Sequence, residues 1–321
     1  MYLSAPLSST GTLMEQSVFP LFLLRIILSV IGILGNGFLI ISVLHLTRVK
    51  TFEVFLLGLA IANLGEIMLV DIYDAIIQSM HNLNISCIVL KLLKICGENV
   101  SIFFTVLICI YRYQKIHNAA MRIIAPIFMD SRDAAIGLSV GCVLIALLFS
   151  LPTYFLTHDT LPMKNSTREL CPADFFLCSE DNCPTLNNIY RYLYIIICHV
   201  LPLIIVTWTS LLIIKILFIQ QKAVDAHHES DATVAHNHHH HHHHHHEHDV
   251  FHRSTIGILA AMTLFQVDCI LYLILHLVFS PYDFPAWSQL EFFIATLYTG
   301  IIPYIYGMGH NFFSVKHFMK E

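Results

Sequence analysis

The chain has 321 residues, of which 56% are hydrophobic and only 12% are charged. An average soluble domain carries about twice that share of charged residues, so the apolar surface exceeds what one globular core can bury. The net charge of −5 is small and scattered along the chain, which excludes a nucleic-acid-binding surface. The composition therefore predicts an integral membrane protein in contact with membrane lipid.

Seven apolar stretches are each long enough for a helix to cross a bilayer, which needs about 20 residues. Pro20 stands where the first helix is expected to begin. Residues 1–18 show no cleavable signal peptide, so we expect the first helix to direct insertion. The predicted fold is an all-α bundle of seven transmembrane helices at residues 19–45, 54–78, 88–113, 134–156, 190–219, 254–280 and 289–309.

Lysine and arginine near the helix ends predict the orientation, because these residues collect on the cytoplasmic side. With the N-terminus outside, eleven of them lie on the cytoplasmic side and six on the outer side. Two glycosylation acceptor triplets, which begin at Asn84 and Asn165, then fall outside the cell. We therefore expect a multi-pass plasma-membrane protein with an extracellular N-terminus and a cytoplasmic C-terminus.

These spans divide the chain into an extracellular tail at 1–18, a seven-helix domain at 19–310 and a C-terminal stretch at 311–321. Within the domain, residues 157–189 are expected to form the second extracellular loop. Residues 220–253 are expected to form the third cytoplasmic loop, which contains 14 histidines. In the C-terminal stretch, phenylalanines stand among polar residues, which is typical of a short helix on the membrane surface.

Six polar or charged residues lie near the middle or in the outer half of the spans. An ionisable group at bilayer depth costs about 3 kcal/mol on insertion scales, so it normally faces the bundle interior. Three acids against one lysine predict an acidic cavity for a small ligand that is cationic or rich in hydrogen-bond donors. The alternative is a structural network of protonated carboxyl groups. The six residues are Glu66, Lys94, Glu98, Asn99, Gln266 and Asp268.

Within this set, Lys94 and Glu98 lie four residues apart on one helix face and can pair. The sequence names no partner for Glu66 or Asp268. If Glu98 and Asp268 face each other, a cationic ligand would relieve the repulsion between them.

Five short motifs follow one another along nearly the whole chain. They are Gly35-Asn36 in the first span, Leu59-Ala60-Ile61-Ala62-Asn63 in the second, Cys87 at the start of the third, Tyr111-Arg112-Tyr113 near its end, and Ile302-Pro303-Tyr304-Ile305-Tyr306 in the seventh. In this order and spacing they resemble the motifs of rhodopsin-like G-protein-coupled receptors. The resemblance implies a receptor that binds a small-molecule ligand, activates a heterotrimeric G protein and is not an enzyme.

Several positions depart from the family pattern. In the family an acid precedes the arginine, whereas this chain has Tyr111 there. The family also has an acid in the second span, where this chain has Asn63. Ile302 replaces the asparagine before the seventh-span proline. The fourth span also lacks its usual tryptophan, and the sixth lacks Cys-Trp-x-Pro. This set of losses resembles vomeronasal type-1 receptors and the ora olfactory receptors of fish, which implies a pheromone or odorant ligand.

Other classes of membrane protein share some of these features. Orphan rhodopsin-like receptors for other small ligands and bitter-taste-like receptors share some of the same losses. An opsin is excluded because residues 289–309 contain no lysine for a retinal Schiff base. An aminergic receptor is excluded because Lys94 stands where its aspartate would be. A transporter would also use charged residues in spans, but it would be expected to show an internal repeat.

The resemblance also implies roles for individual residues. Tyr111, Arg112 and Tyr113 would contact the G protein, with Arg112 stabilising the active state; the alternative for Arg112 is an ordinary cytoplasmic-side arginine. Residues at helix contacts would rearrange on activation, namely Asn36, Asn63, Pro303 and Tyr306. Cys87 would form a disulfide with the second extracellular loop, and Cys178 is the first candidate by the family interval. Cys183 is nearly as good a candidate. Four cysteines allow three pairings, and the sequence alone does not choose among them.

The histidine run from His238 to His246 is the remaining unusual feature. It offers no fixed ligand geometry, so we interpret it as a solvated low-complexity loop rather than a metal site. The sequence predicts no cofactor.

Overall fold

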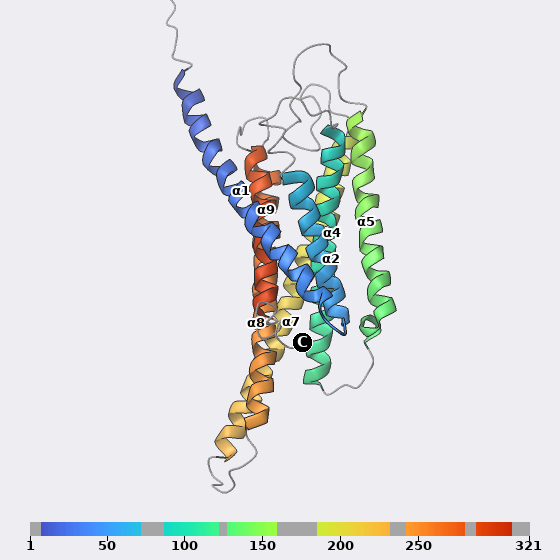
Figure 1. The fold of residues 1–321 in the computed structure, drawn as a ribbon, viewed down its shortest axis with the longest axis vertical. Helices are drawn as coiled ribbons and strands as arrows, with labels where there is room; N and C mark the ends of the chain where they lie inside the picture. The colour runs from blue at the N-terminus through green and yellow to red at the C-terminus, as the bar shows by residue number, and fades with distance from the viewer. Residues whose placement is uncertain are drawn as a thin grey trace, which may run out of the picture.

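The computed structural model describes residues 8–71, 87–121, 127–158, 185–231, 242–279 and 287–309. These residues form long helices that run up and down through one bundle (Figure 1). The principal helices are α1 (Ser8–Leu44), α2 (Thr51–Glu66), α4 (Cys87–Ala120), α5 (Arg132–His158), α6 (Thr185–Ile195), α7 (Leu201–Asp231), α8 (His242–Val278) and α9 (Trp287–Gly309). Short turns of other helix types are η1 (Ile67–Asp71), η2 (Phe128–Asp130) and η3 (Ile196–Val200).

Seven spans are long and apolar enough to cross a membrane, which confirms the predicted count within the part of the chain that the structure describes. The helices α6, η3 and α7 together make one continuous span, Thr185–Lys222. Large apolar side chains cover the outside of the bundle, and Leu44, Leu148 and Trp208 are each more than 60% exposed. In water such a surface would be unfavourable, so it is a surface for lipid.

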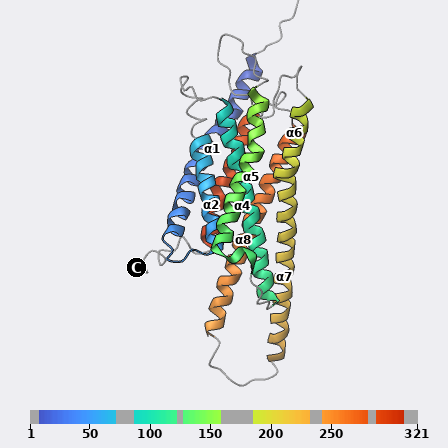
Figure 2. The same cartoon turned by 90° about the vertical axis from the view of Figure 1, so that its right-hand side faces the viewer.

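Four helices, α1, α4, α7 and α8, extend well beyond the apolar stretches that predicted them. α1 begins at Ser8, so Pro20 lies inside the helix and marks the start of its apolar span. α4 continues from residue 113 to Ala120. α7 reaches Asp231 and α8 begins at His242, so both enter the segment expected to be a loop and project below the other helices (Figure 2). A hydropathy window finds where a helix leaves lipid, whereas the helix itself continues into polar sequence.

The π-helical turn η3 ends at Val200, two residues before Pro202. Proline has no backbone N–H and its ring clashes with the carbonyl four residues earlier. A wider turn at this point relieves the clash without ending the span. The chain thus passes from α6 into α7 as one membrane-crossing unit.

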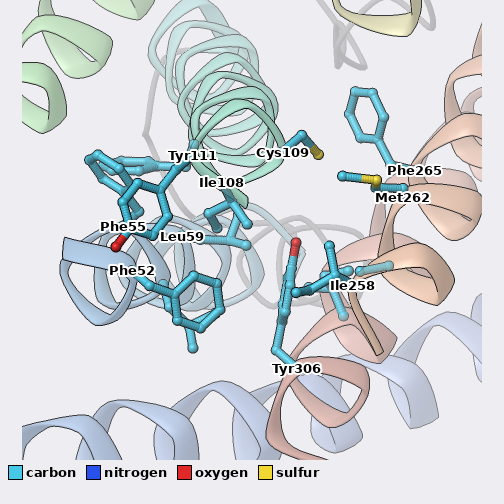
Figure 3. Packing of buried hydrophobic residues seen from close by; sticks show 14 of the residues in the cluster. Phe52, Phe55, Leu59, Ile108, Cys109, Tyr111, Ile258, Met262, Phe265 and Tyr306 are labelled. Atoms are coloured by element: carbon cyan, nitrogen blue, oxygen red, sulfur yellow. The ribbon is translucent and has the colours of Figure 1, made fainter. Parts of the chain in front are cut away.

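α4 is the central helix of the bundle and contacts α2, α5 and α7, while α1 packs against both α2 and α9 (Figure 1). The lower half of the bundle encloses its largest apolar core. In Figure 3 the labelled side chains of this core come from four helices: Phe52, Phe55 and Leu59 of α2, Ile108, Cys109 and Tyr111 of α4, Ile258, Met262 and Phe265 of α8, and Tyr306 of α9. This packing fixes α4 against α8 and α9, the helices that carry the candidate site.

Glycines permit the closest approach between α1 and α9. A Cβ atom added to Gly32 would lie 2.6 Å from Ile67 Cδ1 and 3.0 Å from the Cα atom of Gly300. A Cβ atom on Gly300 would lie 3.1 Å from the carbonyl oxygen of Leu28. Small residues at such crossings let helix backbones pack closely in membranes. By contrast, a Cβ atom on Gly37 would meet nothing within 4 Å.

We therefore expect Gly32→Ala to destabilise the protein by about 1–3 kcal/mol, because the added methyl overpacks the α1–α9 contact. The matched variant Gly37→Ala should be neutral or up to about 1 kcal/mol more stable, because alanine favours helix. Thermal unfolding of the purified protein in detergent measures both. Equal melting temperatures for the two variants would contradict the close packing.

Candidate functional site

Four charged or titratable side chains meet inside the upper half of the bundle, and we call them the charged cluster: Lys94, Glu98, His276 and Glu291. The ammonium nitrogen of Lys94 lies 2.9 Å from Glu291 Oε1 and 3.6 Å from Glu98 Oε1. Nε2 of His276 lies 3.6 Å from the same Glu291 oxygen. Lys94 and Glu98 lie near the start of α4, Glu291 near the start of α9 and His276 near the end of α8. The cluster therefore joins three helices at one end of the bundle.

The ring of Phe292 brings a second cation close to this cluster. The guanidinium carbon of Arg25 lies 4.1 Å from the ring centroid, and the ammonium of Lys94 lies 4.2 Å from it. Both cations are 1% exposed. Cation–π contacts of this kind are stronger when the cation is desolvated. Phe292 therefore helps to hold α1 and α4 at the start of α9.

A row of rings, which we call the aromatic ladder, flanks the charged cluster. It consists of Tyr194, His199, Tyr272, His276 and Trp287. His199 stacks on Tyr272 with ring centroids 3.8 Å apart, and Tyr272 stacks on His276 at 4.0 Å. His276 meets Trp287 edge-to-face at 4.8 Å. The ladder connects α6 and η3 with α8 and α9.

The six predicted cavity residues do not all meet at one place. The predicted pair of Lys94 and Glu98 is present, and Asn99 Oδ1 accepts a hydrogen bond from Tyr194 at 3.1 Å. Asp268 lies within electrostatic range of Glu98. A Cβ atom on Gly97 would come within 3.3 Å of Glu66, so Glu66 packs directly against α4. Gln266 instead faces α7, where its amide nitrogen lies 3.3 Å from Thr207 and 3.4 Å from Ser210.

Several polar atoms around the charged cluster are buried and have no hydrogen-bond partner among the residues that the structure describes. They are Asn99 Nδ2, His199 Nε2, Asp268 Oδ1, Glu291 Oε2 and both ring nitrogens of His276. Leaving such atoms unsatisfied costs about 1–3 kcal/mol each. A set of donors and acceptors at one end of a bundle, beside aromatic rings, is the arrangement of a small-molecule site.

Sequence reasoning missed two members of the charged cluster, Glu291 and His276. Glu291 is the only charged residue in residues 289–309, and an ionisable residue inside a span is a functional candidate by default. His276 gave no such signal, because a lone histidine in an apolar run is common. Among the described residues, no group of three or more histidine, cysteine, aspartate or glutamate side chains is placed to hold a metal ion.

A neutral network lies below the charged cluster at mid-bundle. Asn36 donates to the carbonyl oxygens of Gly32 at 2.9 Å and Thr299 at 3.0 Å. Asn63 donates to Asn36 at 3.5 Å and accepts from Ser101 at 2.8 Å. An amide can donate and accept at once, which a carboxylate cannot. Asn63 therefore links α1, α2 and α4 without a charge.

The two other predicted contact residues of α9 lie beside α1 and α2. A Cβ atom on Gly35 would lie 2.9 Å from Pro303 Cγ, so α1 packs tightly on the proline. Tyr306 is buried, and its ring lies 6.2 Å from that of Phe52 (Figure 3).

The Tyr111-Arg112-Tyr113 motif lies toward the lower end of α4. The guanidinium carbon of Arg112 lies 3.7 Å from the ring centroid of Phe52. Tyr111 donates to Asp130 at 2.8 Å, and Lys115 forms an ion pair with the same carboxylate at 3.0 Å. Tyr113 packs on His117 with ring centroids 5.7 Å apart. The tyrosine that replaces the expected acid thus binds an acid from the η2 turn.

Asp130 lies outside the membrane spans. Partial burial raises the pKa of its carboxyl group, but the hydrogen bonds from Lys115 and Tyr111 outweigh that effect and leave the pKa below its ordinary value. The carboxylate therefore stays charged at neutral pH, and its contribution to stability would be lost only in acid, as the pH falls through this lowered pKa.

Several predicted residues lie outside the part of the chain that the structure describes. Cys87 begins α4, but its candidate partners Cys178 and Cys183 lie outside the described residues. The same is true of Asn84, Asn165 and residues 311–321.

Comparison with known protein families gives the class of this protein. The sequence matches the family described as 7 transmembrane receptor (rhodopsin family) over residues 35–306. A comparison with curated proteins gave no match. The match covers most of the chain, from within the first span to within the seventh. The chain therefore belongs to the rhodopsin family of seven-transmembrane receptors, which are G-protein-coupled receptors and not enzymes.

We expect Lys94→Met to destabilise the protein by about 3–5 kcal/mol, because it leaves buried carboxylates without their cation. The double variant Lys94→Met/Glu291→Leu should be more stable than Lys94→Met alone, since it also removes one stranded charge. The exposed pair offers a control: Lys115→Met should cost less than about 1 kcal/mol. Thermal unfolding in detergent measures all three, and a double variant that is no more stable than Lys94→Met alone would contradict the pairing.

Proposed function

We propose that this receptor detects a small chemosensory ligand, a pheromone or odorant with a cationic group, and activates a heterotrimeric G protein. The observation that carries this proposal is the set of buried, unsatisfied polar atoms around the charged cluster. They lie beside the aromatic ladder, on the helices α4, α8 and α9 and the turn η3. The chain would lie in the plasma membrane with this end of the bundle outside.

The sign of the ligand charge follows from the balance of charges. Glu98, Glu291 and Asp268 bring three carboxyl groups to the region, while Lys94 contacts two of them directly. An excess of carboxyl groups in a low-dielectric interior favours a cation or a strong donor. Aromatic faces stabilise cations as well. A structural network of protonated carboxyl groups is the competing explanation.

The chemosensory assignment rests on the departures from the family pattern. Asn63 takes part in a neutral network, and Tyr111 binds Asp130. Both positions lack the acid that most family members carry, and this absence resembles the pattern of vomeronasal type-1 and ora receptors. A receptor for another small ligand is the alternative. A transporter is disfavoured by the family match, and ion flux in reconstituted vesicles would revive it.

The signalling end would be the lower one, where Arg112 lies about 27 Å along α4 from Lys94, at 1.5 Å per residue. Arg112 stacks on Phe52 of α2, and Phe52 also contacts Tyr306 of α9. Separation of the lower helix ends would release the arginine toward a G protein. The contacts of Arg112 thus link it to the helices that would move.

We expect Arg112→Ala to abolish the second-messenger response of transfected cells while surface expression is retained. Arg132→Ala is the matched control, because Arg132 is exposed at the start of α5. A calcium or cAMP assay with basal and ligand-evoked arms makes the comparison. An unchanged response of Arg112→Ala at equal surface density would refute the coupling role.

A screen of small amines against transfected cells would supply the agonist for the second test. Glu98→Gln and Asp268→Asn should each weaken a cationic agonist by about 1–3 kcal/mol, the range for leaving a charged group without its partner. Asp133→Asn, an exposed change near the start of α5, should have no effect. If Glu98→Gln and Asp268→Asn both keep full agonist potency and lose only thermal stability, the two carboxyl groups are structural.

A further inference from the structure

We propose that the outer face of α7 and α8 binds a second copy of this chain within the membrane. The contact would be made by Gln266, Thr207 and Trp208, which we call the polar patch. It would be symmetric, so that the same patch lies on both sides of the interface. The proposal concerns the association of two receptors and stands apart from the proposed ligand.

The first member of the patch is an amide that is only partly satisfied. Nε2 of Gln266 donates to the hydroxyl of Thr207 at 3.3 Å and to that of Ser210 at 3.4 Å. These two contacts use both N–H groups of the amide. The amide oxygen accepts no hydrogen bond from the residues that the structure describes. The side chain is partly exposed at the junction of α7 and α8, so this acceptor is left on the outside of the bundle.

The other two members are donors on α7. The hydroxyl of Thr207 accepts from Gln266, but its own proton goes to no acceptor within the described part of the chain. Trp208 is 64% exposed, and its indole N–H also has no acceptor among the described residues. α7 runs along the edge of the bundle (Figure 2). Both donors therefore face away from the other helices.

The depth of the patch makes this exposure unfavourable in lipid. Gln266 lies near the middle of the span Ser254–Val278, and its contact with Thr207 places that part of α7 at the same level. The hydrocarbon core is about 30 Å thick and offers no hydrogen-bond partners. The polar groups of lipids lie at its two surfaces, and tryptophan is usually found there. Partners at the level of the patch must therefore come from another protein helix.

The match between donors and acceptor favours a second copy of the same chain. The patch offers the oxygen of Gln266 as acceptor and the groups of Thr207 and Trp208 as donors. Residues across a two-fold axis contact each other reciprocally. The acceptor of each copy would then lie against the donors of the other copy. Hydrogen bonds between polar side chains hold transmembrane helices together in this way.

Apolar side chains form a rim around the patch. Ile204 and Leu211 lie one turn from Thr207 on α7, and Ile270 lies one turn from Gln266 on α8. All three are exposed. In a pair of receptors they would pack against the other copy and keep lipid away from the polar contact, as the rim of an interface does.

Energy transfer between donor-labelled and acceptor-labelled copies of the full-length receptor tests the proposal. Phosphatidylcholine vesicles that contain only this purified protein exclude other partners. Transfer should rise with the ratio of protein to lipid, as in a monomer–dimer equilibrium. Gln266→Leu should weaken dimerisation by about five- to tenfold, because two symmetry-related contacts are lost. Leu148→Ala, at a similarly exposed residue of α5, should leave dimerisation unchanged.

A mixture of two variants tests whether the contact is reciprocal. Gln266→Leu keeps the donors and lacks the acceptor, whereas Thr207→Val/Trp208→Phe keeps the acceptor and lacks the donors. Neither variant can form the polar contact with itself, but a mixed pair can form one of the two. The mixed pair should associate about threefold more tightly than either variant with itself, beyond the statistical effect of mixing.

Absence of transfer at every protein density would overturn the proposal, as would dimerisation that Gln266→Leu leaves unchanged. Equal weakening by Leu148→Ala, or a mixed pair no tighter than the separate variants, would also overturn it. If Gln266→Leu does not fold, Thr207→Val/Trp208→Phe still tests the contact, because it should weaken dimerisation to the same extent. Native mass spectrometry tests lipid as the occupant. A lipid retained by a monomeric receptor and lost from Gln266→Leu would show that lipid covers the patch and would overturn the second copy.

Discussion

The ion pair between Lys94 and Glu291 is the interaction on which the upper half of the bundle depends. The lysine is 1% exposed within a membrane span, so its counter-charges must come from the protein itself. Glu291 of α9 supplies one at 2.9 Å, and Glu98 of α4 supplies another at 3.6 Å. Because the partners belong to different helices, burial of one charge fixes the approach of α9 to α4. Removal of either partner would leave a buried charge uncompensated.

Buried polar groups in a membrane span need partners from within the protein, and the kind of partner changes along the length of the bundle. At the upper end the partners are opposite charges and aromatic faces around Phe292 and His276. At mid-bundle they are neutral amides and hydroxyls, with Asn63 as both donor and acceptor. At the lower end an apolar core fills the space and Arg112 lies on Phe52. The polar atoms left unsatisfied lie mainly at the upper end, which is why we place the ligand there.

The sequence was sufficient to predict the seven spans, the Lys94–Glu98 pair and the order of the family motifs. Hydropathy and spacing along one helix are local properties, so a single sequence carries them. It could not predict that Glu291 and His276 complete the cluster, because that depends on how α8 and α9 are rotated against α4. The sequence-based prediction also placed Gln266 with the cavity residues, although its side chain faces α7, because the rotation of α8 is not visible in the sequence. Helix ends were also misplaced, since a helix such as α4 continues into polar sequence after it leaves the apolar span.

The proposed ligand site requires that the region around Glu98 and Asp268 be acidic and reachable by small solutes. Cysteine accessibility tests it most directly, with Asp268→Cys in intact cells and the unsubstituted receptor as background. The rate of modification would be compared for a permanently cationic and an anionic methanethiosulfonate reagent of similar size. We expect clearly faster reaction with the cation, because the carboxyl group of Glu98 remains within electrostatic range of the new thiol. Equal rates, or faster reaction with the anion, would contradict it.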